Sequence, residues 1–234
     1  MPALTAADRK LSLSKRNRAN KKGLPQGAQS IENAVKAVKQ FKKVKFDETI
    51  NVVVNLGIDP KQADQIVRGS VSLPHGTGKS ARVIAFCQSD KIAGAKAAGA
   101  IEAGGEDLVA KIEGGWMDFD VAVASPDMMR VVSKLGKVLG PKGLMPSPKA
   151  GTVTPNINEA VKEYSAGKQE YRNDDGGNVH AVIGKMSFAE KALAENLTAF
   201  LETINKVKPA SSKGTYIKKC VIAGCMSPGV QVAV

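Results

Sequence analysis

The segment 75–80, HGTGKS, has the residue types of a phosphate-binding loop. In such a loop, glycines let backbone amides approach the phosphates and a lysine supplies positive charge. The full motif also needs a glycine five residues before Gly78, and that position holds Leu73. The segment also precedes the apolar run at 82–86 instead of joining a strand to a helix. Both features argue against nucleotide binding and favour a turn with a flanking lysine.

No other group of residues has the spacing of a catalytic or metal site. His180 is expected to point away from the core, and no serine or cysteine nucleophile with a visible base accompanies it. Asp174 and Asp175 lie in a turn-forming sequence, which accounts for them without chemistry. The three cysteines form no CxxC pair, so a disulfide framework or zinc site is not expected. The sequence predicts a non-enzymatic, reduced cytosolic protein with buried thiols and no cofactor.

Positive charge is concentrated at the N-terminus. The net charge of the 234-residue chain is +12, and residues 1–46 carry +10 of it. A second basic run lies between Asp127 and Glu159, where no acid interrupts Lys137, Lys142 and three further basic residues. A localised basic surface favours a polyanion, since each neutralised phosphate releases condensed counterions. A solvated charged tail without a partner is the alternative.

The segment 136–146 presents Lys137 and Lys142 among three glycines and two prolines. This composition predicts a turn-like, little shielded backbone whose amides and ammonium groups are able to contact phosphates. An Ω-like surface loop without a ligand is the alternative. Aromatic residues make up 4% of the chain, so backbone and shape recognition of folded RNA is expected instead of extensive base stacking. Phe46 follows Lys45 in a basic stretch, but patterning alone predicts a core position for it at a helix–strand junction.

Residues 1–29 are polar and charged with scattered glycine and proline, and they are expected to be mobile when free. The sequence has no run of 18 apolar residues and no apolar signal-peptide core, so neither a membrane span nor secretion is expected. The composition of this stretch leaves a mitochondrial presequence as an alternative.

The terminal parts of the chain have half-exposed, amphipathic patterns. Ser30 is predicted to cap a helix whose apolar face runs from Ile31 to Phe41, and residues 50–56 alternate as a strand with one buried face. The other elements predicted there are a short strand at 71–73, a hairpin of 170–172 with 179–183, a capping box at 187–190 that opens a long helix, and strands at 216–223 and 230–234.

The middle of the chain has short, fully apolar runs. Residues 82–86 and 121–124 predict strands buried on both faces, with helices at 91–98 and 106–112 between them. A further helix is predicted to follow the Ser125 cap, and Trp116 is expected to pack at a domain edge. This alternation predicts a small parallel sheet with helices on its faces.

The two styles of pattern predict an α/β and α+β fold in two domains. Both termini, residues 1–75 and 168–234, are expected to build a split α+β domain. Residues 76–167 are expected to form an inserted, Rossmann-like parallel α/β domain. Gly76, Gly78 and Gly167 lie at the two crossings, where they suit a hinge.

Several strings of residues occur in the order seen in one family. Over about residues 30–232 the chain resembles the bacterial-type L-one family of large-subunit ribosomal proteins, the family of the mobile stalk. The strings lie at 46–49, 56–60, 67–69, 71–76, 78–79, 115–120, 135–146, 148–153, 172–174, 184–185 and 213–215.

The resemblance implies a two-domain protein, part of the ribosome and a monomer when free. It implies binding to the stalk of large-subunit rRNA near the tRNA exit site, with assistance to the release of deacylated tRNA. It also implies repression of the protein's own operon mRNA, through a site that mimics the ribosomal one. The partners implied are therefore large-subunit rRNA, the operon mRNA and exit-site tRNA, in the cytoplasm, with no membrane and no cofactor.

Residue by residue, the resemblance assigns RNA contacts chiefly to the split domain. The positions are Phe46, Thr49, Met226 and Ser227, with weaker assignments to Lys45, Arg172, His180, Lys185 and Thr215. Lys137 and Lys142 of the inserted domain are expected to supply a secondary contact.

One loop departs from the family pattern. The family usually has Thr-Met-Gly-Pro where this chain has Cys225, Met226, Ser227 and Pro228. Cysteine donates hydrogen bonds more weakly than threonine, and serine does not readily adopt every backbone conformation open to glycine. The site is expected to persist with some contacts changed.

Two other functions stay open from the sequence. One is a nucleotide-dependent enzyme that uses Gly78, Lys79 and Ser80. The other is a regulator that acts only on messenger RNA, off the ribosome.

Overall fold

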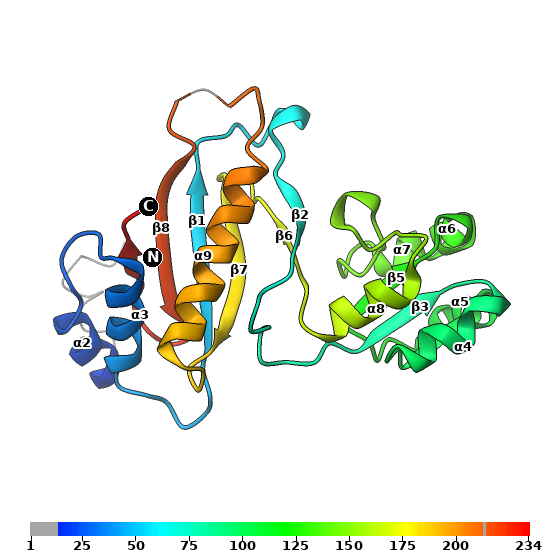
Figure 1. The fold of residues 1–234 in the computed structure, drawn as a ribbon, viewed down its shortest axis with the longest axis horizontal. Coiled ribbons are helices and arrows are strands. Elements are labelled where there is room, and N and C mark those ends of the chain that lie inside the picture. The colour runs from blue at the N-terminus through cyan, green and yellow to red at the C-terminus, as the bar shows by residue number, and fades with distance from the viewer. Residues whose placement is uncertain (1–13, 213) are drawn as a thin grey trace, which may run out of the picture. The chain divides into compact units, whose positions relative to one another are not determined.

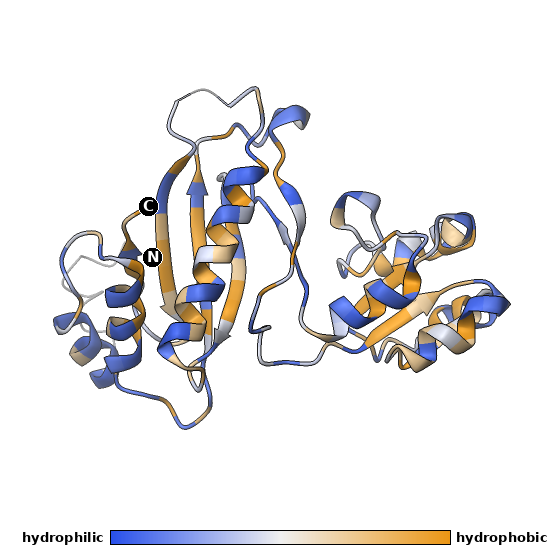
Figure 2. Ribbon diagram, in the orientation of Figure 1, coloured by the Kyte–Doolittle hydropathy of each residue, from blue (hydrophilic) through white to orange (hydrophobic). Residues whose placement is uncertain are grey.

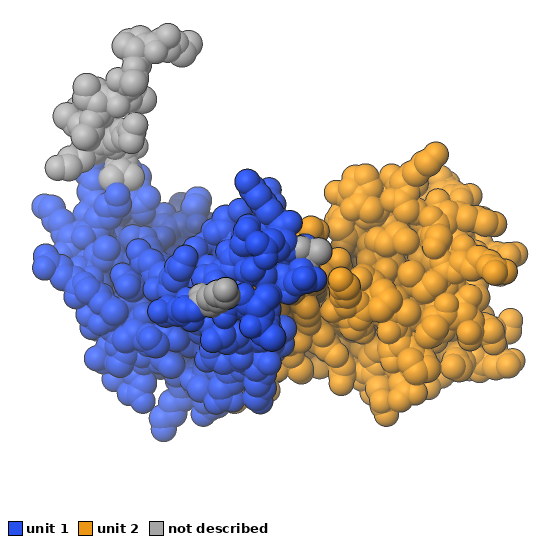
Figure 3. Space-filling model, turned by 90° about the horizontal axis from the view of Figure 1, so that it is seen from above, with its two compact units in different colours: residues 1–66, 173–234 blue, residues 67–172 orange. Residues whose placement is uncertain are grey.

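The computed structural model describes residues 14–212 and 214–234, which form two compact units (Figures 1 and 3). The first unit combines the chain up to Ile66 with Asn173–Val234, and the second is Val67–Arg172. Residues 1–13, which include much of the stretch considered as a presequence, lie outside the described residues. The domain boundaries near residues 75 and 167 stay a prediction.

The first unit is built on a four-stranded antiparallel sheet in the order β7-β1-β8-β9. Its central strand β1 (Thr49–Leu56) pairs with β7 (Asn178–Lys185) on one side and β8 (Ile217–Gly224) on the other. The short β9 (Val230–Val232) pairs with β8. Strand β1 alternates buried and half-buried residues along its whole length, as its sequence predicted.

Two helices cover one face of this sheet, α3 (Ile31–Gln40) and α9 (Glu190–Lys206) (Figure 1). The Ser30 side chain accepts a hydrogen bond from the backbone N of Asn33 at 3.4 Å, so the predicted cap is confirmed. A further helix, α2 (Lys15–Lys22), precedes α3 in a stretch expected to be mobile, and it is strongly hydrophilic (Figure 2). A short 3₁₀ turn, η1 (Ala63–Gln65), lies near the end of the first segment.

The second unit contains a parallel three-stranded sheet, β4-β3-β5. The strands are β3 (Val83–Phe86), β4 (Glu102–Gly104) and β5 (Val121–Ala124). Helices α4 (Ser89–Ala97) and α8 (Ile157–Ser165) pack on one face. On the other face are α5 (Glu106–Glu113), α6 (Met129–Val132) and α7 (Gly136–Leu139), with the 3₁₀ turns η2 (Pro126–Met128) and η3 (Ser133–Leu135) between β5 and α7.

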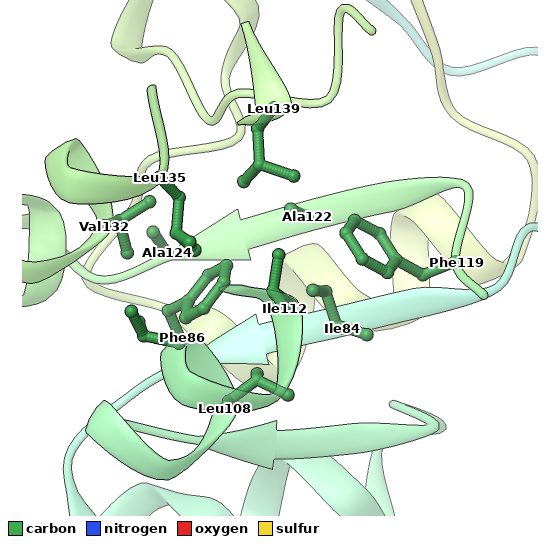
Figure 4. Packing of buried hydrophobic residues seen from close by; sticks show 11 residues of the cluster. Ile84, Phe86, Leu108, Ile112, Phe119, Ala122, Ala124, Val132, Leu135 and Leu139 are labelled. Carbon is green, nitrogen blue, oxygen red and sulfur yellow. The ribbon is translucent and has the colours of Figure 1, made fainter. Parts of the chain in front are cut away.

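The core beneath α5 shows why β3 is entirely apolar. Ile84 and Phe86 of β3 point toward Leu108 and Ile112 of α5, and Leu135 and Leu139 close the same cluster (Figure 4). Trp116 packs at the margin of this cluster, with its ring centroid 5.7 Å from that of Phe119. The prediction of a parallel sheet covered by helices is confirmed, and with it the α/β and α+β fold class.

The predicted hairpin of 170–172 with 179–183 is wrong. Strand β6 (Gln169–Arg172) pairs with β2 (Arg68–Val71), so these residues form a separate two-stranded ribbon within the second unit. A single bridge, Asn173 to Val179, joins the two segments that were predicted to pair. The strand predicted at 71–73 is β2, which begins earlier and ends at Val71.

One of the other two predicted helix caps is also wrong. Helix α9 begins at Glu190 with Ala189 as its N-cap, because Ser187 is bound elsewhere: its backbone N and Oγ both donate to the Asp47 carboxylate, at 3.1 and 2.8 Å. The other, Ser125, is the N-cap of η2 with Pro126 in its first turn, as predicted. Its hydroxyl makes no capping bond, however, and is buried without a partner among the described residues. Within the described part of the chain, no helix is long and apolar enough to cross a bilayer.

Candidate RNA-binding surface

Three segments of the first unit meet at the end of the sheet where β1 begins (Figure 1). The register places Thr49 opposite Lys185, at the end of β7, and Ile50 opposite Gly224, at the end of β8. The segments are therefore 41–48 before β1, 185–187 after β7 and 225–228 after β8. Most of the RNA contacts that the resemblance assigned lie on them.

Two large apolar side chains are exposed at this end. Phe46 is 55% exposed and Met226 is 50% exposed, and they belong to the first and third of these segments. The core position that patterning predicted for Phe46 is therefore wrong. Exposed apolar side chains on neighbouring segments indicate a contact surface when polar groups surround them.

Basic and polar groups surround this apolar pair. Lys45 is exposed beside Phe46, and the Lys185 Nζ donates to the backbone oxygen of Asp47 at 3.4 Å. Thr49 is half-buried, and its backbone oxygen accepts from the backbone N of Cys225 at 3.0 Å. These bonds, together with that from the backbone N of Met186 to the backbone oxygen of Glu48 at 2.8 Å, fix the segments to one another, so the surface is preformed by the fold.

The sequence analysis missed Glu48, which organises the third segment. Its side chain is 2% exposed, and its Oε2 accepts from the backbone N of Met226 at 3.4 Å and from the Ser227 Oγ at 3.0 Å. The Arg16 guanidinium donates to its other carboxylate oxygen at 3.4 Å. The missed signal is the period of β1, because Glu48 continues the buried series that begins at Ile50.

The two residues that depart from the family pattern fit this arrangement. Among the described residues, no residue other than glycine has a positive φ, so Ser227 does not require the backbone conformation that favours glycine. Its hydroxyl instead binds the Glu48 carboxylate. Gly224 lies so close to the same carboxylate that a Cβ there would collide with it. Cys225 is exposed and contributes a backbone bond to Thr49.

Three of the assigned residues do not belong to these segments. His180 is exposed halfway along β7, opposite Val53, on the sheet face that α3 and α9 leave uncovered. Thr215 precedes Ile217, which pairs with Leu56 at the opposite end of β1. Arg172 belongs to β6, in the second unit.

The acids of the turn before β7 have the structural role expected for them. The Asp174 carboxylate accepts hydrogen bonds from Asn178 and from the backbone N of Gly176, at 2.7 to 3.2 Å. These bonds, those from Asn178 first, lower the pKa of Asp174 to about 2. The His180 ring lies 3.4 Å from the same carboxylate, which orients the imidazole on the sheet surface.

Lys137 and Lys142 are both exposed in the second unit, but the backbone around them is more regular than expected. Residues 136–139 form helix α7, with Leu139 completely buried, and turns follow over residues 140–143. An Ω-like loop is therefore the wrong description of residues 136–139. Lys137 extends from α7, and Lys142 extends from the turns that follow it.

Sequence comparison assigns the chain to a class of ribosomal proteins. The model of the Ribosomal protein L1p/L10e family matches residues 38–228, and the chain belongs to this family. Two relatives carry the name large ribosomal subunit protein uL1. That of Nocardioides sp. is 56% identical over 199 residues, covering 85% of this chain and 83% of the relative. That of Kosmotoga olearia is 51% identical over 205 residues, covering 88% and 89%.

These findings confirm the resemblance. They also decide between the two hypotheses of a nucleotide-dependent enzyme and a structural ribosomal protein. The family is one of structural, non-enzymatic ribosomal proteins. The segment 75–80 agrees with this, because it leads into strand β3 and not into a helix. The nucleotide-dependent enzyme is therefore excluded.

Proposed function

We propose that the chain is a structural constituent of the large ribosomal subunit that binds the stalk region of large-subunit rRNA near the tRNA exit site. Family membership and the names of the relatives support the ribosomal role. The observation that carries the RNA-binding site is the exposure of Phe46 and Met226 on segments fastened to the same end of β1.

The groups on this surface divide into two kinds of RNA contact. Lys45 and Lys185 are placed to neutralise phosphates, which supplies affinity without reading the sequence. Phe46 and Met226 offer flat or polarizable apolar surface to riboses and unstacked bases, and Thr49 adds a hydroxyl donor and acceptor. His180 extends the polar surface along the open face of the sheet, whereas Thr215, at the opposite end of β1, contributes only to an RNA that reaches well beyond the surface. Arg172 of the second unit would be a separate contact.

A further part of the proposal concerns the two places, near residues 75 and 167, where the chain passes between the predicted domains. Residues 76–167 act as an inserted domain that moves about the crossings near 75 and 167 and brings Lys137 and Lys142 to a secondary RNA contact. Movement of this kind would assist the release of deacylated tRNA from the exit site. The free protein is a monomer in this proposal.

The same surface would serve translational repression. A messenger RNA that folds like the stalk would occupy the contacts around Phe46 and Met226, so the protein cannot hold both RNAs at once. Repression of its own operon would then begin when the protein exceeds the available rRNA.

Binding of the purified protein to a stalk RNA fragment across a salt series tests the central proposal. We expect tight binding that weakens with salt, and strong losses for Phe46→Ala and Met226→Ala. Val207→Ala is the matched control, because Val207 is also an exposed apolar residue (41%) but lies just after α9. Weak binding to the stalk fragment, equal to that of an unrelated folded RNA, would show that the assignment is wrong.

Two further measurements separate the ribosomal role from a purely regulatory one. Co-sedimentation with large subunits is expected for a ribosomal constituent and not for a regulator that acts only on messenger RNA. Competition between the stalk fragment and the leader of the operon mRNA tests the shared surface. Simultaneous binding of both RNAs to one protein would contradict it.

A further inference from the structure

Helix α2 lies against the proposed RNA surface although it precedes the region that the family model matches, residues 38–228. The Arg16 guanidinium donates to the backbone oxygen of Met226 at 2.9 Å and to the Glu48 carboxylate at 3.4 Å. Farther along the helix, the buried Asn20 side chain accepts from the backbone N of Lys42 at 2.9 Å. The helix is thus fastened to two of the three segments that form the surface.

Arg16 compensates the negative charge of the buried Glu48 carboxylate. Glu48 is almost completely buried beneath the 225–228 loop, and its other partners, Met226 N and Ser227 Oγ, are neutral. A buried carboxylate without a cation is costly, and it repels phosphates that approach the loop. The Arg16 guanidinium offsets both effects and also holds the loop through the Met226 carbonyl.

Lys21 lies on the outer side of the same contact. Asn17 and Lys21 of α2 line a pocket of 230 Å³ together with the loop residues 225–228. Lys21 is exposed and lines this pocket together with Met226. An RNA strand lying over Met226 would bring a phosphate within reach of this charge.

We propose that α2 is part of the RNA-binding surface, with Arg16 as a positioning residue for the 225–228 loop and Lys21 as a phosphate contact. The proposal rests on the proposed function, since it extends the same site. It assigns a role to part of the N-terminal basic stretch, which the sequence left open.

Stalk RNA binding by the full chain tests both roles, with Arg16→Ala, Glu48→Gln, the double variant and Lys21→Ala. We expect Arg16→Ala to weaken binding on the order of tenfold, the effect of losing one hydrogen bond to a charged group. Glu48→Gln removes the uncompensated charge, so in that background the Arg16→Ala loss should shrink to about threefold or less. The salt slope of Arg16→Ala should equal that of the wild type.

Lys21→Ala should behave differently from Arg16→Ala. Loss of a phosphate contact weakens binding and lowers the salt slope by about 0.7–0.9. Lys206→Ala is the matched control, because Lys206 is also an exposed lysine, at the end of α9, and its replacement should leave both quantities unchanged. Circular dichroism of each variant before binding establishes that the fold is retained.

The outcomes distinguish this inference from the proposed function. If the wild-type protein does not prefer the stalk RNA, the proposed function itself fails. If the wild type binds but the Arg16 and Lys21 variants behave like Lys206→Ala, only the role of α2 is overturned. A reduced salt slope for Arg16→Ala, without rescue by Glu48→Gln, would show a direct phosphate contact and overturn its positioning role.

Discussion

Replacement of Ser227 by alanine tests whether the Glu48 carboxylate really anchors the 225–228 loop. The substitution removes the Oγ donor at 3.0 Å from the carboxylate and leaves the backbone free to keep its conformation, which glycine would not ensure. A hydrogen bond to a charged group contributes about 1.5–3 kcal/mol. Ser227 is half-buried, so water replaces part of this bond, and we expect a loss of about 1.5–2 kcal/mol in the free energy of unfolding.

The chain offers a convenient assay, because its only tryptophan, Trp116, lies in the second unit. In urea, far-ultraviolet circular dichroism reports on both units, whereas tryptophan fluorescence reports on the second. With an m value of about 2 kcal/mol/M, Ser227→Ala should lower the midpoint of the first unit's transition by just under about 1 M. The fluorescence midpoint should stay unchanged.

Ser211→Ala is the control for this experiment, since Ser211 is exposed in the same unit. A Ser227→Ala protein whose circular dichroism midpoint matches that of the control would refute the reasoning. The loop would then be held by its backbone bonds alone, and the Glu48 carboxylate would have no anchoring role there.

Three further predictions concern titration and reactivity. Burial raises the pKa of Tyr164 from 10.0 to about 12. The stability that the protonated Tyr164 contributes is therefore present below pH 10 and is lost as the pH rises through 12. Urea unfolding of wild type and Tyr164→Phe, monitored by fluorescence across this pH range, measures this contribution. Hydrogen bonds lower the pKa of Asp174 to about 2, so the stability that its ionised carboxylate contributes is present above pH 3.8 and is lost as the pH falls through 2. Carbon-13 NMR should show the Asp174 carboxylate ionised at about pH 3. A titration midpoint of this carboxylate near about pH 4 would contradict the turn geometry. Iodoacetamide should label Cys225 rapidly, and Cys87 and Cys220 only on unfolding, since both are buried. Bound stalk RNA should slow the Cys225 reaction, and equal rates with and without RNA would place the RNA elsewhere.

Helices and strands were predicted correctly from the sequence where residues close to one another in the chain determine the structure. The alternation in β1, the apolar run of β3 and the Ser30 cap each depend on residues within a few positions, and each is confirmed. Ser187 shows where this reasoning fails. Its distance from Asp47 is 140 residues along the chain, yet this acid takes the hydroxyl that a capping box requires.

The candidate site shows the same division between local and distant causes. The resemblance assigned RNA contacts to Phe46 and Met226, and both side chains are exposed, although patterning alone placed Phe46 in the core. Glu48 was available to the alternation argument, because it shares the parity of Ile50, but the partner that makes its burial tolerable is Arg16. No local rule connects a helix in the N-terminal basic stretch to a strand more than twenty-five residues later.

The order of the strands in the first unit determines when this unit is able to fold during synthesis. Strand β1 is central, but both of its partners, β7 and β8, are translated only after the whole second unit. The parallel sheet of the second unit needs no residue beyond Arg172, so it is able to form first. The loop at 225–228 and β8, which carries it, also follow the whole second unit in the sequence. A growing chain therefore acquires the proposed RNA-binding surface only after the second unit has been made, which would keep shorter unfinished copies from occupying RNA.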